Sequence, residues 1–220
     1  MSVRRPLLWL MAIAWVDVAI PAIAFAAAAD GGATITFRKV FKTSYPEYVE
    51  IKVSQSGMGT YDIRALDEEA SPQPFEVGAA LAQRIFELGS RLHNFQGVNL
   101  DVRRRIAYLG EKSFRYENRG ETHEVKFNYT LDEAATQLVN IFEGLTRQEL
   151  DLSDLKRTMR YDRLGVNDSL VQIETDFNNK LLPEPERLLP ALDQLAADEK
   201  YLDLARQRAR TLAGRIRGSR

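Results

Sequence analysis

The hydrophobic pattern of this chain changes near Leu131. Before this residue, apolar and charged side chains alternate, as at Val49, Ile51 and Val53, which is typical of strands with one buried and one wet face. After it, apolar residues recur at helical spacing as far as the C-terminus. We therefore predict an α+β protein with a sheet region followed by a helical region. A parallel nucleotide-binding sheet is not expected, because its strands would be apolar on both faces.

An antiparallel sheet of about five strands is predicted for residues 30–130. Since each strand has one apolar and one charged face, one side of the sheet should be covered and the other solvated. Apolar residues at helical spacing from Leu81 to Leu92 predict a helix over 78–92 that covers the apolar side. The predicted strands are the segments 34–38, 49–53, 60–65, 114–117 and 124–129.

Two connecting segments of the sheet region carry their own signals. Residues 71–74 contain two prolines and predict a turn, and residues 103–109 predict a short helix that Gly110 stops. Three consecutive arginines, Arg103, Arg104 and Arg105, begin this helix. We interpret them as a solvated helical turn, with contact to an anion or an acidic partner as the alternative.

Residues 131–220 are predicted to form three or four helices that include a long helical hairpin. Gly165 bends or breaks the first long amphipathic segment, and the sequence from Pro183 to Pro185 ends it. Asp198 is a candidate cap within the second long segment, which makes that segment one helix or two. The helical region either packs on the sheet as part of one domain or forms a subdomain.

Residues 1–29 read as a signal peptide. Arg4 and Arg5 precede a long apolar stretch, and small residues end it at Ala29, before Asp30. This pattern predicts export, with cleavage near Ala29 and a mature chain that is periplasmic or extracellular. The alternative is a retained N-terminal membrane anchor, because about twenty apolar residues are long enough to span a bilayer.

Composition excludes several classes of function. The chain has no cysteine, so it has neither disulfides nor a thiol nucleophile nor a cysteine-based zinc site. Its formal net charge is −1, which gives no field that would attract nucleic acid. There are two histidines, at positions 93 and 123, and neither belongs to a metal-binding or nucleophile motif. We expect no metal and no cofactor.

Catalytic candidates are weak. His123 shares the inward face of its strand with Val125 and Phe127, so we interpret it as a partly buried structural residue. The alternative is a hydrolase or lyase in which His123 and the neighbouring carboxylate of Glu124 act as acid and base. His93 follows a predicted helix, where a cation favours the helix C-terminus. Charges of both signs on the outer sheet face predict cross-strand ion pairs, with a carbohydrate or peptide site as the alternative.

An arginine-rich tail is the most unusual feature of the chain. Residues 132–203 contain 16 acids and 8 bases, whereas residues 204–220 contain arginines and no acid. The preferred interpretation is intramolecular, with a basic last helix packed beside an acidic helical region. Binding of an acidic partner or of anionic lipid headgroups are the alternatives. The candidate anion-binding residues are Arg206, Arg208, Arg210, Arg215 and Arg217.

These observations favour a non-enzymatic binding or structural module of the cell envelope or exterior. Its expected partners are another envelope protein or a second copy of itself, and nucleic acid is not expected. The alternatives are the His123 and Glu124 hydrolase or lyase, and a membrane-peripheral protein attached through the arginine-rich helix.

Overall fold

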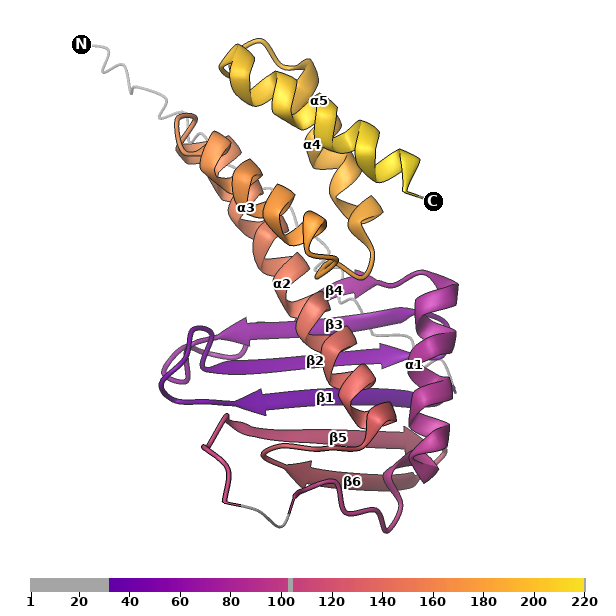
Figure 1. The fold of residues 1–220 in the computed structure, drawn as a ribbon. Helices are drawn as coiled ribbons and strands as arrows, with labels where there is room; N and C mark the ends of the chain where they lie inside the picture. Colours follow the sequence, from indigo (N-terminus) through magenta and orange to yellow (C-terminus); the bar gives the residue numbers. More distant parts are fainter. Residues whose placement is uncertain (1–31, 103–104, 220) are drawn as a thin grey trace, which may run out of the picture.

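A six-stranded antiparallel sheet and the helices on one of its faces form the first half of the molecule (Figure 1). The computed structural model describes residues 32–102 and 105–219, so the predicted signal peptide lies outside the described residues. The strands follow the order β4-β3-β2-β1-β5-β6. Their bounds are β1 Thr34–Val40, β2 Tyr48–Ser54, β3 Met58–Arg64, β4 Gln73–Glu76, β5 Glu111–Asn118 and β6 Glu121–Phe127.

The α+β prediction is confirmed, with one more strand than expected. The additional strand, β4, lies in the segment predicted as a proline-rich turn. Its Pro74 is tolerated because β4 is an edge strand, where a missing N–H breaks no pairing on the open side. Phe75 of β4 is buried, and its ring meets that of Tyr61 edge to face at 5.7 Å. Burial of this aromatic residue holds the edge strand in place.

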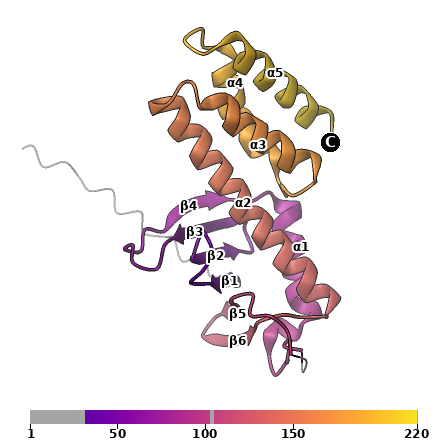
Figure 2. The same ribbon diagram turned by 60° about the vertical axis from the view of Figure 1, so that its left-hand side comes forward.

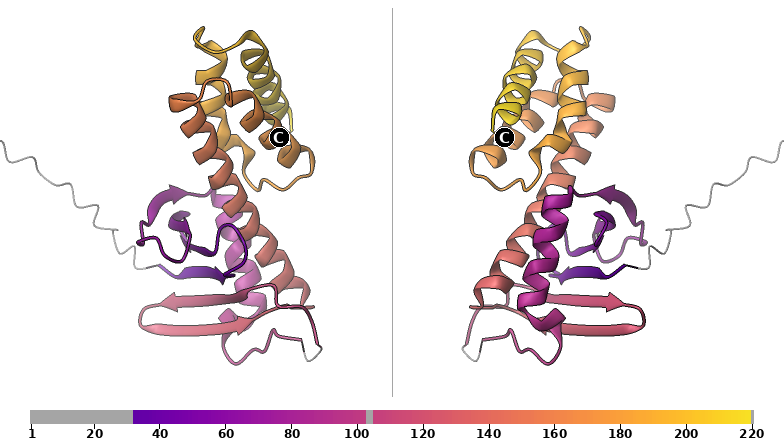
Figure 3. Two further views of the ribbon diagram at one scale, coloured as in Figure 1. Left: turned by 90° about the vertical axis from the view of Figure 1, so that its left-hand side faces the viewer. Right: turned by 90° about the vertical axis from the view of Figure 1, so that its right-hand side faces the viewer.

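Two helices cover the apolar side of the sheet, as Figure 3 shows from both sides. These are α1, Ala79–Arg91, and the first half of α2, Glu133–Tyr161. Asp132 caps α2 by accepting a hydrogen bond from the backbone N–H of Ala135 at 2.9 Å. Phe142 of α2 stacks on Phe37 of β1 with ring centroids 5.3 Å apart, and both are fully buried. The outer side carries the cross-strand ion pairs that the sequence predicted, such as Lys52 with Glu117 at 3.2 Å.

The short helix predicted over 103–109 is wrong for its described part, since residues 105–109 have no helical structure. The Asn128 side chain after β6 instead accepts from the N–H of Leu109 at 2.7 Å and donates to the carbonyl of Ala107 at 3.0 Å. These bonds satisfy backbone groups that a helix would otherwise pair internally. Arg105 is exposed, and Arg103 and Arg104 lie outside the described residues.

The second half of α2 joins three further helices in a separate hydrophobic core, which stands beyond the β4 edge of the sheet (Figure 2). These are α3 Val166–Asn178, α4 Leu189–Ala197 and α5 Asp203–Gly218. The described part of the C-terminal region therefore has four α-helices, where three or four were predicted. The chain turns at Gly165 and after Asp198, so α2 pairs with α3 and α4 pairs with α5. Short 3₁₀ helices, η1 His93–Phe95 and η2 Pro185–Leu188, complete the described secondary structure.

A polar junction near the middle of α2 connects the two cores. Glu149, which is buried on α2, forms an ion pair with Arg187 of η2 at 2.7 Å. The Arg187 guanidinium also lies 5.1 Å from the centre of the Phe75 ring at the sheet edge. Glu184 accepts a hydrogen bond from the N–H of Gly78 at 2.6 Å. The segment 184–187 therefore attaches the helical half to the sheet edge, because its side chains contact both α2 and the residues of and after β4.

The buried carboxyls of Asp151 on α2 and Asp176 on α3 are expected to make stability depend on pH. Both are buried, and burial together with the nearby charge of Asp176 raises the pKa of Asp151 to about 7. The pKa of an aspartate in the unfolded chain is near 3.9. Between about pH 4 and pH 7 the Asp151 carboxyl is therefore protonated more fully in the folded state than in the unfolded state. Stability should therefore fall as pH rises from about 4 through 7. We expect Asp151→Asn to remove this loss and to raise the unfolding free energy above pH 7 by about 1 kcal/mol.

Urea unfolding at about pH 5 and about pH 9 measures this difference. The exposed loop variant Asp67→Asn is the matched control and should leave the pH dependence unchanged. If Asp151→Asn showed the same loss of stability with rising pH as the unmodified protein, the assignment to Asp151 would be wrong.

Candidate functional site

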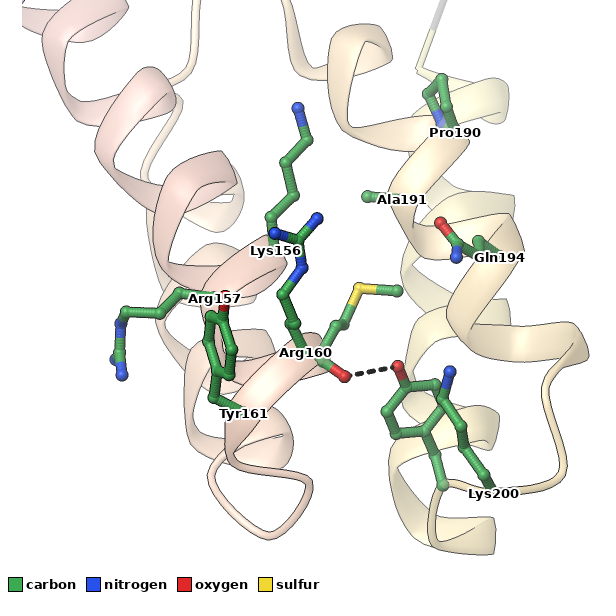
Figure 4. Close-up of a pocket in the computed structure, with 10 residues that line it drawn as sticks. Lys156, Arg157, Arg160, Tyr161, Pro190, Ala191, Gln194 and Lys200 are labelled. Carbon is green, nitrogen blue, oxygen red and sulfur yellow. Dashed lines mark hydrogen bonds between the residues drawn. The ribbon is translucent and has the colours of Figure 1, made fainter. Parts of the chain in front are cut away.

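A groove between the C-terminal part of α2 and α4 gathers basic and aromatic side chains (Figure 4). Its volume is about 580 Å³, within the range of roughly 300–1,000 Å³ typical of ligand sites. We call it the cationic groove. Its lining residues are Lys156, Arg157, Met159, Arg160, Tyr161, Pro190, Ala191, Gln194, Lys200 and Tyr201.

The helical pattern of α2 positions the basic side chains. Leu155 and Met159 are buried in the second core, and Lys156 and Arg160 each follow one of them by one position. A step of one residue turns by about 100° around a helix, so both cations flank the buried stripe and stay exposed. Figure 4 shows them between α2 and the opposite helix, where Ala191 leaves room because its side chain ends at Cβ.

Lys156 and Arg160 form no ion pair within the described residues. Burial raises the pKa of the Glu149 carboxyl, and the charge of Lys156 reaches this group and partly offsets the rise. The Arg160 guanidinium lies 5.8 Å from the centre of the Tyr161 ring. Lys156 and Arg160 lie four positions apart on one helix face, where like charges destabilise a helix by about 0.2–0.5 kcal/mol.

The other two cations of the groove are paired with acids that do not line it. Arg157 contacts Asp154 at 2.5 Å and points away from the groove in Figure 4. Lys200 contacts Asp198 at 2.6 Å.

Tyr201 forms a fixed part of the groove floor. Its hydroxyl donates to the backbone carbonyl of Met159 at 2.9 Å, the bond dashed in Figure 4. That carbonyl belongs to the last turn of α2, where carbonyls have no partner within the helix. Tyr161, in contrast, is 75% exposed at the rim. The groove therefore offers a rigid aromatic floor, an exposed aromatic rim residue and free positive charge.

This arrangement is suited to holding negatively charged groups. The lining residues include four cations and the Gln194 amide, and no carboxylate or histidine. Guanidinium and ammonium groups bind carboxylates and phosphates by charge-assisted hydrogen bonds. General acid–base chemistry requires a group that titrates near the working pH, and the groove supplies none of the usual carboxylate or imidazole groups.

The arginines of α5 that were predicted to bind anions contact groups of the protein itself. Arg208 and Arg215 of α5 both contact Glu174 of α3, at 2.7 and 2.8 Å, and Arg217 contacts Asp193 of α4 at 2.5 Å. Arg206 contacts Asp203 at 2.8 Å, and Arg210 donates to the carbonyl of Ala196 at 2.9 Å. The intramolecular interpretation of the basic tail is thus confirmed. Binding of an acidic partner or lipid by these arginines stays a prediction.

The two catalytic candidates lie on opposite faces of the sheet. His123 faces inward and is half-buried, with its ring stacked on Tyr116 at 6.3 Å. Glu124 faces outward and forms an ion pair with Arg38 at 3.7 Å. The structure does not bring them together, since alternate residues of a strand point to opposite sides. His93 is exposed directly after α1, in a left-handed backbone conformation with φ of 52°.

Residues 32–102 and 105–219 contain neither a cluster of metal-ligating side chains nor a helix able to span a membrane. In this part of the chain, no three histidine or carboxylate side chains gather closely enough to hold a metal ion. No helix of the same residues combines the length and apolar character that crossing a membrane requires. No protein-family model matches the chain, and a search of curated proteins finds no match either.

Sequence reasoning did not identify the cationic groove, although part of its signal was present. Lys156 has no acid three or four positions away on either side, in a region that is acidic as a whole. This identifies an unpaired basic face of a helix. The opposite wall comes from Pro190, Ala191 and Gln194, and their position across the groove depends on how α4 packs against α2.

Removal of the Tyr201 hydroxyl should weaken this end of the helical core. Tyr201→Phe leaves the Met159 carbonyl without its donor, and we expect the unfolding free energy to fall by about 1 kcal/mol. Urea denaturation measures the change. Tyr161→Phe, at the exposed rim residue, is the control and should stay within about 0.5 kcal/mol of the unmodified protein. Equal effects of both substitutions would show that the hydrogen bond does not hold the groove floor.

Proposed function

We propose that this protein is an exported, non-enzymatic binding protein that holds an acidic segment of a partner protein in the cationic groove. The single observation that carries the proposal is the pair of exposed cations, Lys156 and Arg160, which form no ion pair within the described residues. The export part rests on the signal-peptide pattern of residues 1–29.

The chemistry of the groove defines the partner. Carboxylates of the partner would contact Lys156, Arg160 and the amide of Gln194, and relieve the repulsion between the two cations. Apolar or aromatic side chains of the partner would pack on Tyr161 and on the floor near Met159 and Ala191. Since the cations are exposed, binding should weaken as salt increases. Aromatic packing supplies a component that salt does not remove.

A labelled peptide of alternating glutamate and leucine pairs tests the proposal, with a peptide that has glutamine in place of glutamate as the reference. Fluorescence anisotropy would measure both affinities. We expect the acidic peptide to bind more tightly, and the double variant Lys156→Glu/Arg160→Glu to weaken its binding by about tenfold or more, equivalent to about 1.4 kcal/mol.

The double variant Lys42→Glu/Arg105→Glu is the matched control. It changes the net charge equally at exposed residues of the sheet half, outside the groove, and should leave the affinity unchanged. Equal binding of the two peptides, or equal loss in the groove and control variants, would contradict the proposal. Vesicles of anionic phospholipid give a further contrast. Groove-dependent binding to vesicles without binding to the peptide would replace the acidic partner with a membrane surface.

A further inference from the structure

A second pocket is lined by the first half of α2, the end of β1 and the start of β5. These elements belong to the sheet half in Figure 1. The volume of the pocket is about 440 Å³, again within the range of small-molecule sites. It lies in the sheet half and shares no residue with the cationic groove. We call it the lysine pocket, because Lys39 and Lys112 both line it.

The two lysines are direct neighbours across adjacent strands. Lys39 of β1 pairs in register with Lys112 of β5, and like charges in this position repel. Lys39 has a counter-charge, since its Nζ contacts the carboxylate of Glu143 on α2 at 2.9 Å. Lys112 forms no ion pair within the described residues, and it shares the same carboxylate only at longer range, where the charge of Glu143 partly offsets the lowering of the Lys112 pKa.

Lys112 is only 7% exposed, so the lack of a direct ion pair is costly. Its Nζ donates to the backbone carbonyls of Asn128 at 3.1 Å and Leu109 at 3.4 Å, which are dipoles rather than charges. Burial, and then the neighbouring charge of Lys39, lower the pKa of Lys112. The pocket thus contains two cations and one acid, and a bound anion would neutralise the excess.

The rest of the pocket is mainly apolar. Among its lining residues, Phe127 is buried, Val139 of α2 is half-buried, and Tyr129 and Leu109 are partly exposed. Walls of this kind favour a ligand with a hydrophobic body, since removing apolar surface from water contributes about 25 cal/mol per Å². A bare inorganic anion would leave these walls unused.

We propose that the lysine pocket binds a small organic acid with an apolar body. The ammonium groups of Lys39 and Lys112, which are neighbours across β1 and β5, would bind the carboxylate. The apolar part would pack on Phe127 and Val139. Glu143 limits the excess charge to one, which matches a monocarboxylate rather than a dicarboxylate. This inference does not depend on the acidic partner, because it concerns a different site of the sheet half.

Isothermal titration with octanoate tests this proposal, with octanol and octylamine as probes of equal chain length. We expect octanoate to bind and the other two to bind at least about tenfold more weakly, because they offer the lysines no negative charge. Lys112→Met should weaken octanoate binding by about tenfold or more. Lys126→Met removes an exposed lysine from the outer side of β6 and should leave the affinity unchanged.

A second variant keeps the test decisive if Lys112→Met does not fold. Val139→Trp fills the pocket from α2 and leaves both lysines in place, so it should abolish octanoate binding. Octanol binding as tight as octanoate would show that the lysines do not select the ligand. Unchanged octanoate binding in folded Lys112→Met or in Val139→Trp would overturn the proposal, as would an absence of octanoate binding to the unmodified protein.

Discussion

The helix α2 belongs to both hydrophobic cores, and the rest of the structure depends on its continuity. Leu138 and Phe142 in its first half are buried against the sheet, whereas Leu155 and Met159 in its second half are buried among α3, α4 and α5. Both proposed sites also use this helix. Glu143 lines the lysine pocket and Lys156 lines the cationic groove, and their separation corresponds to roughly 20 Å along the helix axis.

The crossing from one core to the other is held by close packing as well as by polar contacts. A Cβ added at Gly144 of α2 would lie 2.8 Å from the side chain of Pro183, so the connection to η2 approaches the helix where the residue is smallest. The Glu149 and Arg187 ion pair lies just beyond this point. Removing one partner of a buried ion pair leaves the other charge uncompensated, which makes this junction sensitive to substitution.

Sequence patterns were sufficient for the fold class and for the inward and outward faces of the strands. They were insufficient where long-range packing decides the structure. β4 forms because Phe75 is buried beside Tyr61, although prolines beside it predicted only a turn. Residues 105–109 stay non-helical because Asn128 pairs their backbone.

The candidate sites, too, were predictable where the sequence pattern decides them and not where long-range packing does. The charge contrast between α5 and the preceding helices was enough to predict their ion pairs. The lack of acids three or four positions from Lys156 indicated a basic helix face, but the groove beside it depends on how α4 packs against α2. Likewise, Lys39 and Lys112 are far apart in the sequence, and only the pairing of β1 with β5 makes them neighbours.

The central claim is that the cationic groove, rather than the arginine-rich helix, is the surface that binds acidic groups. Backbone amide NMR of residues 30–220 titrated with the acidic peptide tests it most directly. The account predicts that the largest shift changes fall on α2 around Lys156 to Tyr161 and on α4 around Ala191 to Gln194. Changes concentrated on α5 around Arg208 and Arg215, with the groove unaffected, would contradict it.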